Sequence, residues 1–577
     1  GEAIEKDLCV WGGDTEGRKE EKRKKRATDI YNMEVTKENF EEVLGDLQEV
    51  IEQCDFLAYD LEMSGVNEVR LNSNSAEEKL LGFLTAEYNY YLTRGAAHSY
   101  RILQFGLCAF RRAGETETHG DLYTSKAFNF YLFQDSAASK MSGRGSQLVF
   151  SVSSAEFLRN NSFQFDKVFH GGISYLRSGD EEAYLKKFTE RRKVESSKPD
   201  LEIREEDEEF IREIREKMLK LAEEGKPGDM EELGLWYSLG WRNRQFLYQL
   251  AREYNTISIR KIGEERGDVF YAKRIPECST EVEKKALEVK EWIGFRNVLD
   301  IIWEAKKPIV GHNCFTDFCF LYDAFIGNLM ESDYETFKKN VHERFPQIVD
   351  TKKLAEHFPI QRTPLQMMYE YVQSERFYKI CELPKGHTDF PLDVECEDYV
   401  SNDGQYHDAA FDAYMTGYVF LRLRKAFEIW KRTEWFEEDI NRICIYGCAQ
   451  SLTLGKDESM KDYSFYLHVD GFPKSMTAKD VQNIISSANA KNLVRVKWIN
   501  DNSLMFIWEE NAPGFEEFAK AMAAREEWTV KPLSKEVLQA YVALLPEGNP
   551  MRGGQKPNGE PSRKRKRTDS APASVTT

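Results

Sequence analysis

One stretch decides the fold of this chain: Phe56-Leu57-Ala58-Tyr59-Asp60-Leu61-Glu62, an apolar run that ends in Asp-x-Glu. Side chains two positions apart on a strand point to the same face, so Asp60 and Glu62 are aimed at one point. A carboxylate at the end of a buried strand is costly unless a positive charge compensates it. The stretch therefore predicts a buried β-strand that presents an acidic pair to a bound cation.

Two further acidic segments complete a constellation. Asp317 follows a strand and turn that end in Gly311-His312-Asn313, and Asp412 follows His407 on a segment with a helical pattern. Alone, an Asp-x-Glu pair is usually a solvated strand end, and a lone histidine usually sits on the surface or in the core. Metal-dependent phosphodiester cleavage accounts for all five side chains together, because oxygen ligands suit Mg²⁺.

Each member of the constellation has an expected role. In such sites two Mg²⁺ ions about 4 Å apart bridge the scissile phosphate. We expect Asp60 to bridge both ions, while Glu62 and Asp412 hold the ion that binds the attacking water. Asp317 orients the second ion through bound waters. His407 takes the proton of the attacking water, since its pKa lies near neutrality.

Composition places the chain among globular proteins. It has 577 residues, 41% of them hydrophobic and 31% charged, which predicts three or four domains. The net charge of −18 does not exclude nucleic-acid binding, because much of the acid lies in local runs and basic runs lie near both ends. None of the ten cysteines forms a Cys-x-x-Cys pair, which predicts free thiols in a reducing compartment. No apolar run is long enough for a membrane span.

The pattern along the chain is typical of an α/β fold with additions. Residues 31–160 and 276–440 alternate strand-like and helical runs and form a discontinuous core. Between them, residues 161–275 read as a small helix-rich module, and residues 461–540 have a βαββα order. Residues 1–30 and 546–577 are basic and low in apolar residues, which predicts a disordered arm and tail.

With His407 five positions before Asp412, the chain resembles the DEDD exonuclease superfamily in its histidine branch; the tyrosine branch would place Tyr where Asp408 stands. Within that branch it resembles the poly(A)-specific ribonuclease family, the deadenylases, over roughly residues 30–540. The segments that carry the resemblance are Leu103–Cys108, Phe165–Phe169, Val310–Asn313, Asp350–Lys352 and Asp412–Gly417. The resemblance implies a ribonuclease H-like exonuclease core, Mg²⁺-dependent release of 5′-AMP from 3′ poly(A) ends, and a homodimer.

The additions resemble nucleic-acid-binding modules of the same family. The inserted module matches an Arg-x-x-x-His signature at Arg244 to Tyr248, with Tyr in place of His. Arg242, Arg244 and Tyr248 are the candidate RNA-binding residues; the alternative is a helix with a basic solvated face.

The C-terminal module resembles an RNA recognition motif, but His468 stands where a stacking aromatic is expected. Trp498 matches the tryptophan with which the family stacks on the mRNA 5′ cap, since an aromatic face suits a cationic base. The alternative is a half-buried strand tryptophan.

Three functions remain open from the sequence. The first is a 3′→5′ exoribonuclease that shortens poly(A); the second is a trimmer of noncoding or piRNA 3′ ends. The third is a catalytically silent RNA- or cap-binding scaffold, against which the filled constellation argues. The basic run Arg563-Lys564-Arg565-Lys566-Arg567 favours nuclear import, so we expect the protein in the nucleus and cytoplasm.

Overall fold

The structure is a computed structural model of the chain. It describes residues 33–66, 76–116, 120–144, 147–195, 200–264, 267–360, 363–381, 392–396, 407–456, 463–488, 490–500, 502–509, 511–525 and 527–543. The predicted basic arm and basic tail lie outside these ranges. Contacts divide the chain into two compact units, the first formed by residues 1–70, 92–446 and 451–458, the second by residues 71–91, 447–450 and 459–577.

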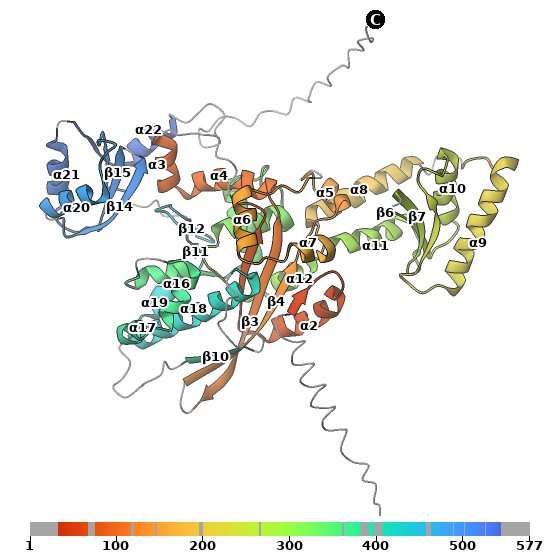
Figure 1. Ribbon diagram of the computed structural model, residues 1–577, viewed down its shortest axis with the longest axis horizontal. Helices are drawn as coiled ribbons and strands as arrows, with labels where there is room; N and C mark the ends of the chain where they lie inside the picture. Colours follow the sequence, from red (N-terminus) through yellow and green to blue (C-terminus); the bar gives the residue numbers. More distant parts are fainter. Residues whose placement is uncertain are drawn as a thin grey trace, which may run out of the picture. The chain divides into compact units, whose positions relative to one another are not determined.

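A seven-stranded mixed sheet forms the centre of the first unit (Figure 1). Its order is β1-β4-β3-β2-β8-β9, with β10 also paired to β4. The strands are β1 (Met33–Val35), β2 (Phe56–Met63), β3 (Ile102–Thr116), β4 (Gly120–Tyr131), β8 (Ile309–Gly311), β9 (Ile348–Asp350) and β10 (Leu392–Cys396). β3 is antiparallel to β2 and β4, whereas β8 is parallel to β2 and β9. The middle of β3 is buried on both faces, as its continuous apolar run predicts.

Helices cover both faces of this sheet. One face packs against α16 (Leu365–Val372), α17 (Glu375–Ile380), α18 (Ala409–Trp430) and α19 (Thr433–Asp439). On the other side lie α2 (Phe40–Gln53) and α12 (Arg296–Ala305) (Figure 1). In the sequence, Asn39, Phe40, Val43, Leu44, Leu47, Val50 and Ile51 recur at helical spacing, which predicts helix α2. The prediction is confirmed, and Phe40, Val43, Leu47 and Ile51 are its buried residues. A mixed sheet between helical layers is the predicted α/β fold.

The remaining elements of the core connect these layers. The helices are α4 (Ala86–Ser99), α5 (Ser136–Met141), α6 (Val152–Asn160), α7 (Phe165–Gly171), α8 (Ser178–Glu195), α11 (Glu281–Ile293), α13 (Phe315–Leu321), the π-helix η2 (Tyr322–Ile326), α14 (Tyr334–Arg344), α15 (Thr351–Leu354) and the 3₁₀ turn η3 (Ala355–His357). Short strands β11 (Arg442–Ile443) and β12 (Leu452–Thr453) pair with each other. No helix in the described ranges is both long and apolar enough to cross a membrane.

The inserted module is smaller and richer in strand than its sequence indicates. It contains η1 (Glu205–Asp207), α9 (Glu208–Glu224), β5 (Met230–Leu235), α10 (Trp241–Ala251), β6 (Ile257–Glu264) and β7 (Gly267–Arg274). The three strands form an antiparallel sheet in the order β5-β7-β6. The structure also moves the predicted start at residue 161, because Phe163, Phe165 and Val168 pack with Leu103 and Tyr131 of the core sheet.

The second unit contains the predicted βαββα order and more. Its elements are α3 (Ala76–Leu84), β13 (Tyr466–Asp470), α20 (Ala478–Ser487), β14 (Leu493–Asn500), β15 (Ser503–Trp508), α21 (Phe515–Ala523), β16 (Thr529–Pro532) and α22 (Lys535–Ala543). The sheet has the order β14-β15-β13-β16, and α20 and α21 pack on one face. α3 and α22 pack on the other, so α3, which the sequence assigned to the core, belongs to this unit.

Candidate active site

The acidic pair lies on the face of β2 that packs against α18. Alternate residues of β2, beginning with Phe56 and Ala58, join the cluster built around α18, and Asp60 and Glu62 continue that face. In the pairing with β3, Asp60 lies opposite Gly106 and Glu62 lies opposite Gln104. The strand thus delivers both carboxylates to the helix, as its alternation predicts.

Gly106 lets α18 approach the sheet. A Cβ atom at this position would lie 1.9 Å from the carbonyl oxygen of Ala409 and 2.4 Å from the amide nitrogen of Ala410. Gln104 fixes the same contact, because its side-chain oxygen accepts a hydrogen bond of 3.1 Å from the amide of Ala409. The first turn of α18 is therefore held directly over the strand that neighbours the acidic pair.

The start of α18 places the last two members of the constellation, His407 and Asp412. The sequence predicts a helix from His407, but the helix begins at Ala409, and His407 adopts a left-handed backbone with φ of 68°. Asp408 caps the helix by accepting a hydrogen bond of 3.3 Å from the amide of Phe411. Because His407 precedes the cap, its side chain is not restricted to the direction a helical position would impose, and it reaches the site beside Asp412.

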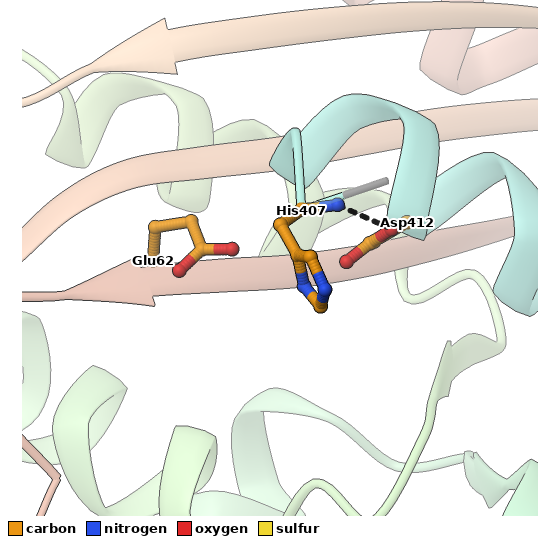
Figure 2. Close-up of side chains that lie close together, drawn as sticks. All are labelled: Glu62, His407 and Asp412. Atoms are coloured by element: carbon orange, nitrogen blue, oxygen red, sulfur yellow. Dashed lines mark hydrogen bonds between the residues drawn. The ribbon is translucent and has the colours of Figure 1, made fainter. Parts of the chain in front are cut away.

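Three of the five predicted site residues meet in one cluster. Ligand atoms of Glu62, His407 and Asp412 all lie within 4.8 Å of one another, and Figure 2 shows the three side chains converging from β2 and the start of α18. The amide of His407 donates a hydrogen bond of 3.4 Å to Oδ1 of Asp412. Asp60 lies close enough to Asp412 and Asp317 for their charges to raise its pKa.

Asp350 at the end of β9 positions Asp317. It is 1% exposed and accepts hydrogen bonds from the amides of Asn313 (2.9 Å) and Cys314 (3.3 Å), which fixes the turn between β8 and α13. Asp317 stands in the first turn of that helix. The parallel pairing of β2, β8 and β9 thus delivers Asp317 to the same edge as the acidic pair.

The four carboxylates destabilise each other as charged groups. Burial is the main cause that raises the pKa of Asp60 and of Glu62 well above their ordinary values, and their mutual repulsion adds to it. Burial also raises the pKa of Asp317 and of Asp412 to about 7 each. In the described part of the chain, no lysine or arginine is among the main influences on these four groups.

A site of this kind fits divalent cations. Four carboxylates, two buried and two half-buried, have no basic partner in the described ranges and supply hard oxygen ligands and negative charge, which Mg²⁺ or Mn²⁺ would neutralise. His407 has a different environment. Burial lowers its pKa, and the half-exposed ring of Phe157 packs edge-on against it at 4.6 Å between ring centroids. A neutral imidazole held in this way can accept a proton.

Sequence reasoning missed the residues that support the site. Gln104, Gly106, Phe157, Asp350 and Asp408 each hold a predicted site residue or the helix that carries it. One signal was available, because a glycine inside an apolar strand indicates close approach by another segment. Asp350 and Phe157 carry no comparable local signal.

The predicted RNA-binding residues of the inserted module do not all stay available. Arg242 forms an ion pair of 2.6 Å with Asp207, which is largely buried. Arg244 lies over the ring of Trp236, 4.0 Å from its centroid, and Lys261 lies 4.2 Å from the same centroid. Tyr248 is 43% exposed on the same helix as Arg244. Trp236 and Lys261 were not predicted, and they extend the candidate surface from α10 to β5 and β6.

In the second unit, the outer face of the sheet is not open. Tyr466, Met505 and Ile507 on that face pack against Phe83 and Leu84 of α3. Trp498 points away from it, because the next residue, Ile499, is the one that joins the α3 cluster. At 37% exposed on the edge strand β14, Trp498 keeps part of its ring accessible.

Comparisons with known proteins place the chain among ribonucleases. Residues 35–420 match the family model described as CAF1 family ribonuclease. Poly(A)-specific ribonuclease PARN of Danio rerio is 26% identical over 511 residues, which cover 82% of this chain and 72% of that protein. The protein of the same name from Arabidopsis thaliana is 25% identical over 595 residues, covering 89% and 83%.

A second kind of relative shares less of the chain. The pre-piRNA 3′-exonuclease trimmer of Bombyx mori is 28% identical over 408 residues, which cover 68% of this chain and 71% of that protein. Among solved structures, S. pombe Pop2p in its Mg²⁺- and Mn²⁺-bound form aligns with a TM-score of 0.34 at 13% identity, covering 72% of this chain and 98% of that chain.

Proposed function

Because the chain belongs to the CAF1 ribonuclease family, we propose that it is a Mg²⁺-dependent 3′→5′ exoribonuclease that shortens poly(A) and releases 5′-AMP. The observation that carries the proposal is the meeting of Glu62, His407 and Asp412 within 4.8 Å, beside Asp60 and Asp317. The PARN relatives support the poly(A) substrate, because their alignments cover 82% and 89% of this chain.

We assign the roles within the site from its geometry. Asp60, Glu62, Asp317 and Asp412 would hold two Mg²⁺ ions, which supply positive charge that activates a water and stabilises the leaving 3′-oxygen. The hydrogen bond from the amide of His407 orients the Asp412 carboxylate. His407, whose pKa burial lowers, is neutral near pH 7 and takes the proton from the attacking water. Phe157 limits the motion of the imidazole by packing on it.

We propose that the inserted module binds single-stranded RNA through its aromatic and basic surface. Tyr237 (70% exposed) follows Trp236 in the chain and Trp241 (61% exposed) begins α10, while Arg244 and Lys261 supply positive charge at the ring of Trp236. Exposed rings next to cations are the pattern of sequence-tolerant stacking. Arg242 contributes less than predicted, since Asp207 already compensates its charge.

We propose cap contact through Trp498 alone, not through the sheet. The central strands of an RNA recognition motif stack bases on their outer face, and here α3 fills that face. An accessible tryptophan at the sheet edge can still stack on a cationic methylguanine. Loss of cap-analogue quenching in Trp498→Ala would support this role, and unchanged quenching would contradict it.

Three further parts of the proposal rest on resemblance or on a sequence pattern. Trimming of noncoding RNA 3′ ends is the second candidate activity, favoured by the Bombyx mori relative and weakened by its smaller coverage. A homodimer is proposed for the active form, which light scattering would test. Nuclear and cytoplasmic residence is proposed from the basic run at residues 563–567, which lies outside the described ranges.

One experiment tests the activity, its direction and its base preference together. The full chain is incubated with 5′-labelled oligo(A), oligo(C) or oligo(U), with and without Mg²⁺. A ladder of shortened oligo(A) that needs Mg²⁺ and is much weaker on the other two supports the proposal. Equal shortening of all three would favour the trimmer, and no shortening of any would leave a binding scaffold.

A further inference from the structure

Tyr446 is the most exposed large hydrophobic side chain in the described part of the chain, at 82%. Single exposed aromatics are ordinary on protein surfaces and by themselves indicate nothing. The position of this one differs, because the segment that carries it is fixed to the same carboxylate that fixes the turn before Asp317.

Asp350 is the common anchor of three segments. Besides the amides of Asn313 and Cys314, it accepts hydrogen bonds of 2.9 Å from the amides of Lys352 and Cys444. These four bonds tie together the turn that leads to α13, the start of α15 and the chain two residues before Tyr446. A buried carboxylate that accepts hydrogen bonds from four backbone amides holds those segments rigidly, because any amide that it released would lose its partner.

A cation links the ring of Tyr446 to that turn. Nζ of Lys352 lies 5.2 Å from the centroid of the Tyr446 ring and 3.3 Å from Oδ1 of Asn313. Asn313 holds a left-handed backbone with φ of 56°, four residues before Asp317. An exposed ring, a lysine and an amide side chain, from three segments that Asp350 anchors, therefore lie together at the turn that precedes Asp317.

We propose that Tyr446 is a stacking platform for one base near the 3′ end of the RNA, held in place through Asp350. The inference rests on the proposed exoribonuclease activity. A ring with one open face and a neighbouring ammonium group suits a nucleobase and its phosphate. Stacking also suits an enzyme that removes nucleotides one after another, because each new base presents the same face to the ring.

The test compares Tyr446→Ala with Tyr446→Phe, which keeps the ring and serves as the matched control. Both variants should unfold at the parent temperature, because the side chain is 82% exposed. Removing a base–aromatic stack costs roughly 5- to 150-fold in affinity, so KM for short oligo(A) should rise by that factor in Tyr446→Ala and stay near the parent value in Tyr446→Phe. The fold-change should appear in KM more than in kcat.

Substrates with a single abasic site locate the stacked base. The abasic site is placed, one position at a time, at the positions nearest the 3′ end. For one of these substrates, the abasic site should raise KM of the parent enzyme. It should not raise KM of Tyr446→Ala further, because that variant already lacks the stacking contact. Equal KM values for parent and Tyr446→Ala, or a penalty that persists for every abasic substrate, would overturn the platform. If the parent itself fails to shorten oligo(A) with Mg²⁺, the proposed activity has failed instead.

Discussion

Gly106→Ala is the substitution that best tests how the site is assembled. The added Cβ would lie 1.9 Å from the carbonyl oxygen of Ala409, whereas ordinary contacts begin at 3.4 Å. The obstacle is backbone on both sides, so the start of α18 would have to withdraw by about 1.5 Å. That movement carries Asp412 and His407 away from Asp60 and Glu62. Misplacement of about 1 Å can cost 10²-fold in rate, and overpacking costs about 1–3 kcal/mol of stability.

The assay is Mg²⁺-dependent shortening of 5′-labelled oligo(A), measured with unfolding temperature. We expect Gly106→Ala to lose about 10²-fold or more in kcat and to unfold at a lower temperature. The matched control is Gly45→Ala on the exposed side of α2, where the new Cβ has no atom within 4 Å. That variant should keep the parent rate and be as stable or slightly more stable. A Gly106→Ala enzyme with the parent rate would refute the role of this close approach.

Two further outcomes follow from the charge of the site and from the place of α3. In metal-free protein the folded pKa of Asp412 is about 7, above its unfolded value of about 3.9, so stability falls as pH rises between these values and then levels off. Asp412→Asn should therefore unfold at a higher temperature than the parent at pH 8 without metal, while losing activity and stabilisation by Mg²⁺; a lower unfolding temperature would contradict this. Phe83→Ala should destabilise the second unit by about 3–5 kcal/mol in a denaturant titration, because Phe83 is 2% exposed and packs against the sheet of that unit. Leu92→Ala, at a 38% exposed position, should change the unfolding free energy little in the same titration.

The sequence was sufficient to predict those parts of the fold and the site that depend only on the spacing of residues along one strand or helix. Asp60 and Glu62 are two apart on a strand, so their common face follows from strand geometry alone. The stripe of α2 and the continuous apolar run of β3 predicted their burial for the same reason. Asp317 and Asp412 reach the same site only because of the order of the strands in the sheet. The sequence indicated that order only through the family resemblance.

Features that depend on contacts between distant segments could not be read from the sequence. His407 continues a helical pattern, yet Asp408 is the N-cap, so the helix begins only at Ala409 and His407 has a left-handed backbone. α3 has the composition of any amphipathic helix, and only the fold shows that it fills the outer face of the C-terminal sheet. The hairpin of β6 and β7 is hidden by its charged residues, because its alternation is weak.

Metal stoichiometry tests the central claim most directly. Mn²⁺ titrated into the metal-free chain should bind at two sites, and Asp60→Asn, which replaces a carboxylate of the proposed metal centre by a neutral amide, should lose at least one of them together with AMP release. The matched comparison is Asp46→Asn at an exposed position of α2, which makes the same chemical change away from the site and should retain both sites. An Asp60→Asn protein that still binds two ions and still shortens oligo(A) would contradict the claim that these carboxylates share one metal centre.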